Sequence, residues 1–280
     1  MSDRLEVRKT YKLYIGGAFP RSESGRTYDV TDHAGNFIAN ACQASRKDLR
    51  DAVVIARGAQ HKWASATAYN RGQILYRIAE MMEGRRDQFA EEIVTSDAIS
   101  LDNALKEVDA AIDTWVWYAG WSDKLGSIAG STNPVSGPYY NFTIPESMGV
   151  IGVLAPDSPS LLGLVQALAP ILVSGNSVIA LASTRAPLSA ITFAEVLATS
   201  DLPGGVCNIL TGKQDELAPW FASHMDIDGI DASGVAQSLL SDIKIAGAQN
   251  LKRIHTFSGN TPHRILAFME AKTIWHPIGV

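Results

Sequence analysis

The chain of 280 residues carries two thiols, Cys42 and Cys207, and a thiolate is the side chain that most readily attacks a carbonyl carbon. Cys207 lies within an apolar run at residues 206–210, and a short run of this kind is typical of a strand buried on both faces. Because apolar burial raises the pKa of a thiol, we expect Cys207 to be an unreactive structural residue. Cys42 lies just before the first long helical pattern.

The remaining chemistry-bearing residues form no known motif. The six histidines show neither HxxxH nor HxH spacing, so we expect no metal site. Neither GxGxxG nor GxxxxGK[ST] occurs, and the Gly204-Gly205 pair is better explained as a tight turn than as a phosphate loop. Asp231 and His255 are of interest because they fall near the ends of predicted strands, where open α/β sheets bind ligands.

The bulk composition excludes several classes of protein. With 46% apolar and 19% charged residues, the chain is typical of a globular protein rather than a disordered one. The net charge of −5 gives no indication of binding to nucleic acid or to an anionic membrane. No apolar run reaches the roughly 18 residues that span a bilayer, and no signal peptide is expected. Two cysteines are too few for a disulfide framework, so we expect a cytoplasmic protein.

One stretch in the middle of the chain organises the rest. Three short runs rich in Val, Ile and Leu alternate there with two longer apolar-periodic segments. The runs and segments, in order, span residues 149–154, 160–174, 177–181, 187–199 and 206–210. Parallel strands buried on both faces need crossover helices, so the pattern predicts a βαβαβ unit. The fold class indicated is α/β, a doubly wound, Rossmann-like parallel sheet with helices on both faces.

The N-terminal part of the chain predicts a set of helices. Ser45 and Asp48 have the spacing of a capping box, so we expect a helix over residues 46–63. Further helices are expected over 69–83, 87–95 and 102–125, and the four should cover one face of the sheet. The aromatic residues of the last helix lie at helical spacing, which favours core packing over a ligand cage.

Other elements are expected before and after these. Residues 11–19 and 27–30 should be short strands, and residues 139–144 alternate aromatic and β-branched side chains like a strand outside the main sheet. After residue 212 the pattern predicts a helix, a fourth strand, a short helix and two further strands, at residues 215–224, 227–232, 235–240, 242–247 and 251–257.

The order of several short motifs carries a resemblance. PESMGVIGVLAP is followed by APILVSGNSVIA, then by PLSA, and then by LPGGVCNILTG; near the N-terminus the chain also reads YIGGAF. Together they resemble the cofactor-binding half of the aldehyde dehydrogenase superfamily. A complete member would continue into a separate catalytic domain, whereas this chain passes from HTFSG almost directly into ILAFMEAKTIWHPIGV. That ending looks like the family's C-terminal oligomerisation strand.

The resemblance therefore implies a module without the catalytic domain. It is most similar to the non-catalytic C-terminal module of the sixteenth aldehyde dehydrogenase family. We expect four segments: N-terminal strands and a helical layer of the Rossmann-like domain, a β oligomerisation strand with its connector, the Rossmann-like core, and a C-terminal oligomerisation strand, over residues 1–126, 127–146, 147–260 and 261–280.

The resemblance also locates the residues of a degenerate crevice. The family's PWNFP, whose Asn helps to hold the oxyanion, corresponds to a segment with Pro156, Asp157 and Ser158. Asp157 would bring negative charge beside a developing oxyanion, which opposes the chemistry. The family's KPSE, whose Lys and Glu grip the adenosine ribose, corresponds to residues 181–184. The family's FTGS, near the pyrophosphate, corresponds to about residues 231–234. The positions concerned are Leu181, Ser183, Thr184, Asp231 and Gly234.

These replacements imply that no catalytic residue is present and that no cofactor is expected, unless the crevice still takes NAD. The acidic Asp231 would repel a pyrophosphate. The resemblance places residues 139–144 and the C-terminal strand in a small oligomerisation sheet. Its expected interface residues are Tyr139, Tyr140, Phe142, Lys272, Ile274 and Trp275.

Three functions remain open at this point. The first is a pseudoenzyme that assembles with itself, as a homodimer, or with a catalytic aldehyde dehydrogenase. The second is a nucleotide- or NAD-binding module that kept the crevice and changed its anchors. The third is a working NAD-dependent aldehyde oxidoreductase, which the missing nucleophile and base argue against. The sequence does not identify the protein partner.

Overall fold

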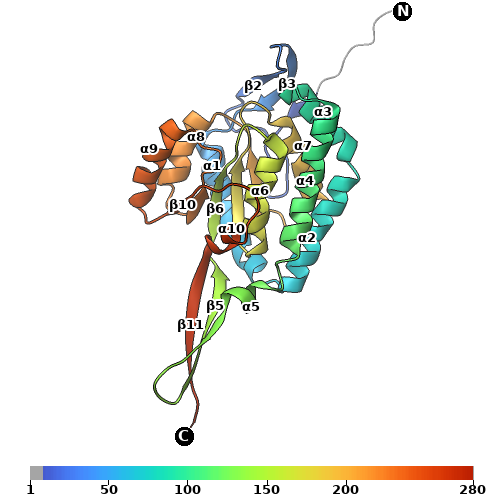
Figure 1. The fold of residues 1–280 in the computed structure, drawn as a ribbon. Coiled ribbons are helices and arrows are strands. Elements are labelled where there is room, and N and C mark those ends of the chain that lie inside the picture. Colours follow the sequence, from blue (N-terminus) through green and yellow to red (C-terminus); the bar gives the residue numbers. More distant parts are fainter. Residues whose placement is uncertain (1–8, 280) are drawn as a thin grey trace, which may run out of the picture.

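The computed structural model describes residues 9–279, and its centre is a five-stranded parallel sheet (Figure 1). The strands stand in the order β10-β9-β6-β7-β8. Their bounds are β6 (Val150–Leu154), β7 (Ser177–Leu181), β8 (Cys207–Leu210), β9 (Gly229–Asp231) and β10 (Arg253–His255). β6, the first of these strands along the chain, lies at the centre of the sheet. The chain adds β7 and β8 on one side of β6 and then β9 and β10 on the other, so the direction of winding reverses between β6 and β9. The expected doubly wound parallel sheet is confirmed, and its switch point lies between these two strands.

Helices cover both faces of this sheet (Figure 1). One face packs against α1 (Arg46–Ala64), α8 (Gln214–Ser223) and α9 (Gln237–Ala248). The other packs against α6 (Ser160–Val173) and α7 (Leu188–Ala198), and these two helices are covered in turn by α2 (Ala68–Glu83), α3 (Arg86–Asp97) and α4 (Leu101–Ala119). The expectation that the first four helices share one face is wrong, because α1 lies on the face opposite α2–α4. The apolar stripe of a helix indicates that this side of the helix is buried, but it does not indicate which face of the sheet buries it.

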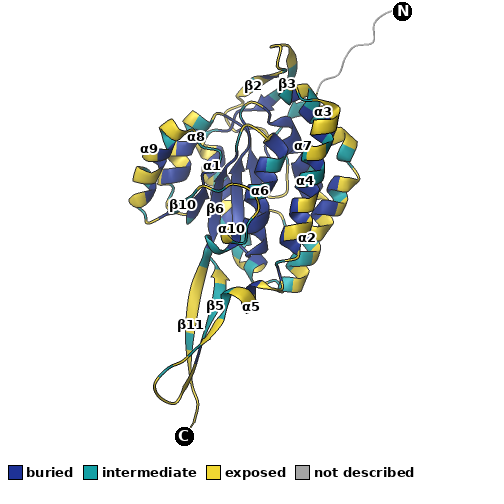
Figure 2. Cartoon of the chain, in the orientation of Figure 1, coloured by how far each residue is buried: buried dark blue, intermediate teal, exposed yellow. Residues whose placement is uncertain are grey.

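The core follows the sheet (Figure 2). Every residue of β6 and β7 is buried, as expected for strands with helices on both sides. Trp115 and Tyr118 of the α4 aromatic cluster are fully buried, and the Trp115 ring stacks on Phe193 with centroids 5.7 Å apart. The interpretation of these two residues as core is confirmed. Among the described residues, no helix is long and apolar enough to cross a bilayer.

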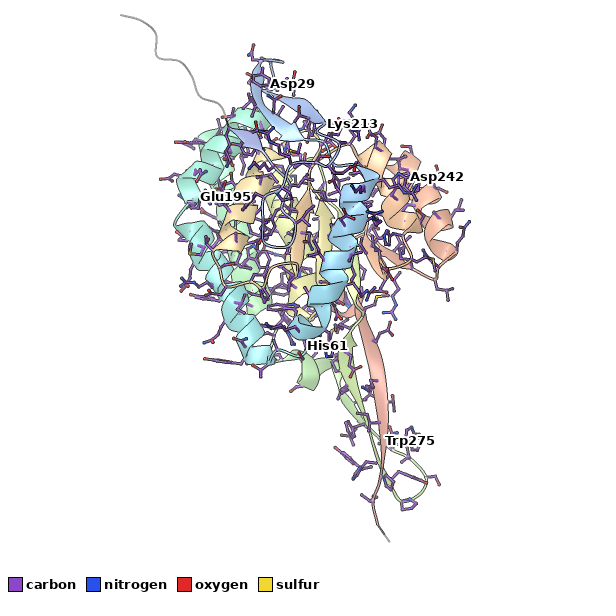
Figure 3. The ribbon with its side chains drawn as sticks, turned by 180° about the vertical axis from the view of Figure 1, so that it is seen from behind. Asp29, His61, Glu195, Lys213, Asp242 and Trp275 are labelled. Carbon is purple, nitrogen blue, oxygen red and sulfur yellow. The ribbon has the colours of Figure 1, made fainter. Side chains whose placement is uncertain are left out.

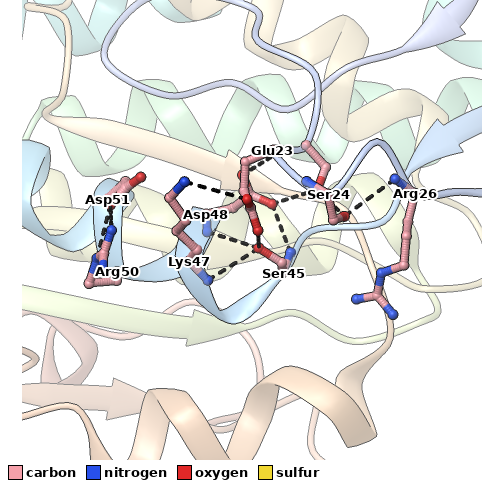
Figure 4. A network of polar contacts seen from close by, with 9 residues as sticks. Glu23, Ser24, Arg26, Ser45, Lys47, Asp48, Arg50 and Asp51 are labelled. Carbon is pink, nitrogen blue, oxygen red and sulfur yellow. Dashed lines mark hydrogen bonds and ion pairs between the residues drawn. The ribbon is translucent and has the colours of Figure 1, made fainter.

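The start of α1 is held by the expected capping box (Figure 4). Ser45 Oγ accepts hydrogen bonds from the backbone N–H groups of Lys47 and Asp48, and Asp48 Oδ2 accepts from the Ser45 N–H at 2.8 Å. Asp48 also accepts from Ser22 Oγ at 2.7 Å, which ties the preceding turn to the helix. Glu23 accepts from Ser45 Oγ at 2.9 Å. The cap is therefore part of a wider polar network.

A second small sheet lies N-terminal to α1. It contains β1 (Thr10–Tyr11), β2 (Thr27–Thr31) and β3 (Phe37–Cys42) in the order β1-β3-β2. The expected single strand over residues 11–19 is wrong. Gly16 and Gly17 turn the chain with φ values of +65° and +83°, which L side chains rarely adopt. Tyr14 instead pairs with Ile209 of β8, at the edge of the main sheet.

Two other element boundaries differ from expectation. The strand expected at 242–247 belongs to the single helix α9, since Leu240, Ile243 and Gly247 are buried at helical spacing. The helix expected over 102–125 ends at Ala119, and a separate short helix, α5 (Leu125–Ala129), follows.

A three-stranded sheet projects from the body as a long ribbon (Figure 1). It contains β4 (Ser131–Asn133), β5 (Tyr139–Ser147) and β11 (Met269–Pro277), and the short helix α10 (His263–Leu266) leads into it. β11 pairs antiparallel with β5, with Trp275 opposite Asn141. The expected pairing of the C-terminal strand with residues 139–144 is confirmed. Figure 3 shows Trp275 far out on the ribbon, at the opposite end of the molecule from Lys213, which follows β8.

Candidate functional site

The carboxyl edge of the main sheet is where a ligand of a doubly wound fold would bind, and here the two loops at the switch point touch. The N–H of Gly234 donates to the carbonyl oxygen of Leu154 at 3.0 Å. A Cβ atom on Gly234 would lie 2.1 Å from the carbonyl carbon of Ala155. The loop after β9 therefore lies directly on the loop after β6, and only glycine fits at the contact.

Three of the expected site residues come together in one hydrogen-bonded group. Asp157 follows β6, and its Oδ1 accepts hydrogen bonds from Ser183 Oγ at 2.8 Å and from the Thr184 N–H at 3.0 Å. Asp157 is exposed, but this oxygen is already occupied by the loop after β7. The carboxylate thus joins two loops of the chain and acts on them as an internal anion.

Two further hydrogen bonds continue around the edge. Thr184 Oγ1 donates to the carbonyl oxygen of Gly212 at 2.9 Å, and Gln214 Nε2 donates to the carbonyl oxygen of Gly234 at 3.1 Å. With the contacts above, these hydrogen bonds link the loops after β6, β7, β8 and β9 into a closed ring. Gln214 was missed by sequence reasoning, because a Gln at the start of a helix carries no signal of a partner twenty residues away.

The other expected residues lie outside this group. Pro156 is half-buried and packs against α6, where a Cβ on Gly163 would lie 2.3 Å from its Cγ. Ser158 is exposed. Leu181 is 1% exposed and its side chain belongs to the core cluster on the α1 face. The Leu181 side chain therefore contributes to packing rather than to a binding surface.

Asp231 is buried at the end of β9 and is paired with a cation. Arg264 Nη2 of α10 lies 3.2 Å from Asp231 Oδ2, and the two side chains are 3% and 1% exposed. Asp231 Oδ1 accepts from the N–H and the hydroxyl of Ser233. The charge that was expected to repel a pyrophosphate is thus neutralised within the protein. Arg264 was not anticipated, because it comes after the segment that resembles the family's cofactor-binding half.

His255 lies opposite Asp231 in the pairing of β10 with β9. Both residues therefore lie at strand ends, as expected from the sequence. Its ring stacks on Phe257 with centroids 5.7 Å apart and meets Phe268 edge-on at 5.6 Å. Burial is the main cause that lowers the pKa of His255. The imidazole is one member of a small aromatic cluster.

The start of α6 has an internal anion of its own. Glu107 Oε1 of α4 accepts from the N–H groups of Leu161 and Leu162 at 3.0 and 3.2 Å. In doubly wound folds, the amides at such a helix start are the ones that bind phosphate. Burial raises the pKa of Glu107, while the two backbone hydrogen bonds oppose that rise. Sequence reasoning missed this residue because the contact spans two elements.

The two thiols are closed off from solvent. Cys42 and Cys207 are each 1% exposed, as expected for Cys207, and burial raises the pKa of the Cys207 thiol far above its ordinary value. Neither thiol is open to a ligand at the carboxyl edge. Within residues 9–279, no group of three or more His, Cys, Asp or Glu side chains is placed to hold a metal ion.

The comparisons with known proteins decide the family. Residues 19–274 match the model of the aldehyde dehydrogenase family. This chain belongs to the aldehyde dehydrogenase family. It is similar to retinal dehydrogenase 2 of Homo sapiens, with 33% identity over 269 residues that cover 94% of this chain and 51% of the relative. It is also similar to cytosolic 10-formyltetrahydrofolate dehydrogenase of Xenopus tropicalis, with 31% identity over 90% of this chain and 28% of the relative.

The solved structures agree with this assignment to the aldehyde dehydrogenase family. The NAD+ complex of an aldehyde dehydrogenase from Bacillus cereus superposes with a TM-score of 0.82 and 26% identity. The match covers 88% of this chain and 50% of that protein. The chain thus spans about half the length of retinal dehydrogenase 2 and of the Bacillus cereus enzyme.

Proposed function

We propose that this chain is a non-catalytic aldehyde dehydrogenase-like subunit that acts in assembly, either with a second copy or with a catalytic aldehyde dehydrogenase. The burial of both thiols, each 1% exposed, carries the proposal. Aldehyde oxidation in this family needs a thiolate to attack the carbonyl carbon, and a thiol with a raised pKa inside a closed core cannot do so.

The geometry of the carboxyl edge supports the absence of a bound dinucleotide. Leu181, which stands where the resemblance places a ribose anchor, is buried, and Thr184 is engaged with Asp157 and Gly212. The residues present therefore do not fit NAD. Losing two charge-assisted contacts, at about 1.5–3 kcal/mol each, is enough to turn micromolar binding into millimolar binding.

The route of the chain after β10 supports the same proposal. In this chain β10 is followed by α10 and then directly by β11, which returns to β5. The segment between His255 and Met269 is too short for a domain that would carry a nucleophile and a base. This arrangement favours a relationship with the non-catalytic module of the sixteenth aldehyde dehydrogenase family.

A second candidate function is favoured by one comparison. The Bacillus cereus structure with a TM-score of 0.82 is an NAD+ complex, so a nucleotide-binding module that uses other anchors is the alternative, and with it an NAD-dependent aldehyde oxidoreductase. The proposal places the subunit in the cytoplasm with a protein partner, and with neither nucleic acid nor membrane, in keeping with its net charge of −5.

Calorimetric titration of the whole chain with NAD+, NADH and NADP+ separates the two candidates. We expect no heat of binding at micromolar concentrations, and micromolar affinity for any of the three would contradict the proposal. Oxidation of short aldehydes by the purified chain should be absent. Any rate that survives the double substitution C42A and C207A would come from a contaminant, whereas a rate that this variant lost would contradict the proposal.

A further inference from the structure

The outer edge of β11 is a long, open strand edge. Among the described residues, β5 is the only strand that pairs with β11, and it does so over all nine residues from Met269 to Pro277. An edge strand of this length presents unpaired N–H and C=O groups, which bind another strand unless charges, prolines or bulges prevent it. The other edge of the ribbon is formed by β4, which is three residues long.

The charges on β11 do not protect this edge. Arg253 Nη2 lies 2.7 Å from Glu270 Oε1, and Lys272 Nζ lies 2.9 Å from Glu146 Oε1. Both ion pairs lie within the chain, so Glu270 and Lys272 are already neutralised. Beyond Lys272, residues 273–279 contain no Asp, Glu, Lys or Arg, and neither do residues 125–145. The distal ribbon therefore has no Asp, Glu, Lys or Arg side chain that would repel an identical ribbon.

We infer that the outer edge of β11 pairs antiparallel with β11 of a second copy, about a twofold axis at Thr273. The inference rests on the proposed assembly role, and adds to it the partner, the strand edge and the register. In such a pairing one residue must face its own copy, since the two strands are identical and run in opposite directions.

The sequence of β11 selects this residue. An axis at Lys272 leaves His276 and Pro277 without an opposite residue in β11 of the second copy, and an axis at Ile274 leaves Met269 and Glu270 without one. Axes at Ala271 or Trp275 leave part of the strand unpaired. With the axis at Thr273, Met269 lies opposite Pro277, and every residue of β11 has an opposite residue in the second copy.

The faces of the paired ribbons fit in this register. Trp275, which is 57% exposed, would lie opposite the small Ala271 of the partner, and its ring already packs edge-on against Tyr139 at 5.8 Å. Trp and Tyr are the side chains that most often anchor interfaces. On the other face, Glu270 would lie opposite His276. No pair of like charges is opposed anywhere along the strand.

Oxidative cross-linking tests the register directly. A Thr273→Cys chain should form a covalent dimer in copper phenanthroline, because the two cysteines would face each other across the axis. An Ala271→Cys chain is the matched control, exposed on the same face of the same strand. Its two cysteines would be about 13 Å apart, beyond disulfide reach. Mixing the A271C chain with a W275C chain should restore the cross-link. Wild-type protein, with both cysteines buried, should give none.

Equal cross-linking of T273C and A271C would indicate random collision and would overturn the inference. So would a dimer by light scattering in which T273C does not cross-link. A wild-type monomer throughout the micromolar range would also overturn it, and would leave the edge to a catalytic aldehyde dehydrogenase. These outcomes are independent of the NAD titration, since Trp275 and the carboxyl edge lie at opposite ends of the molecule (Figure 3).

Discussion

Arg264 Nη2 lies 3.2 Å from Asp231 Oδ2, and this ion pair joins α10 to the end of β9 with both side chains at most 3% exposed. The guanidinium also lies over the Phe257 ring, 5.0 Å from its centroid. Through this contact, the segment that connects β10 to β11 is held against the main sheet. The short helix α10, which leads into β11, is therefore anchored at the carboxyl edge.

Removing one partner of this pair should be costly. R264A leaves the Asp231 carboxylate buried without its cation, so we expect the free energy of unfolding to fall by about 3–5 kcal/mol. The D231A/R264A double variant should lose less than the sum of the single variants, because neither charge is then left unpaired. Urea denaturation of all four proteins measures this. Additive losses would show that the two groups do not interact.

The contact between the loops at the switch point makes a second prediction. G234A should lower the free energy of unfolding by about 1–3 kcal/mol, because the new methyl group would lie 2.1 Å from a backbone carbon. G58A is the matched control: no atom lies near its added Cβ within α1, so we expect a gain of about 0.5–1 kcal/mol. A neutral G234A would mean that the two loops move apart easily.

Lys252 should give the folded state a distinctive pH dependence. Its ammonium donates to the carbonyl oxygens of His224 and Ile227, and burial lowers its pKa from 10.5 to about 8. Between these values the unfolded chain binds more protons than the folded one, so this residue makes the stability rise with pH. The slope is at most about 1.4 kcal/mol per pH unit.

The contribution of Lys252 is isolated between pH 8 and 9.5 as a difference from K252M, because Cys207, Tyr14 and Tyr28 also have raised pKa values and their contributions cancel in that difference. We expect the free energy of unfolding of the wild type, minus that of K252M, to increase over this interval. A difference that stays flat or falls would show that Lys252 remains charged in the folded protein.

Deletion of residues 270–280 tests the role of the ribbon in assembly. It removes most of β11 and exposes the edge of β5, so a dimer should become a monomer or an aggregate as judged by light scattering. A chain that ends at Pro277 keeps the whole of β11 and should remain dimeric. If the full-length protein is already a stable monomer at micromolar concentrations, self-association is wrong.

Much of the fold could be predicted from the sequence because local pattern and burial coincide. The apolar runs at β6 and β7 and the capping box at Ser45 each depend on neighbours within a few residues. The pairing of β11 with β5 was also predicted, from a resemblance together with the need of an isolated strand for a partner. The expectation that one strand covers residues 11–19 failed where two glycines turn the chain.

The sequence by itself therefore determined the α/β class, the order of the main elements and the burial of Cys207, since each follows from local periodicity and hydrophobicity. Only the tertiary structure decided which face of the sheet α1 covers and which groups meet at the carboxyl edge. Asp231 and Arg264, and Gln214 and Gly234, are brought together by loops from different strands. No local pattern encodes such pairs, because a buried polar group needs only some partner of suitable charge and position, and the packing of the sheet supplies it.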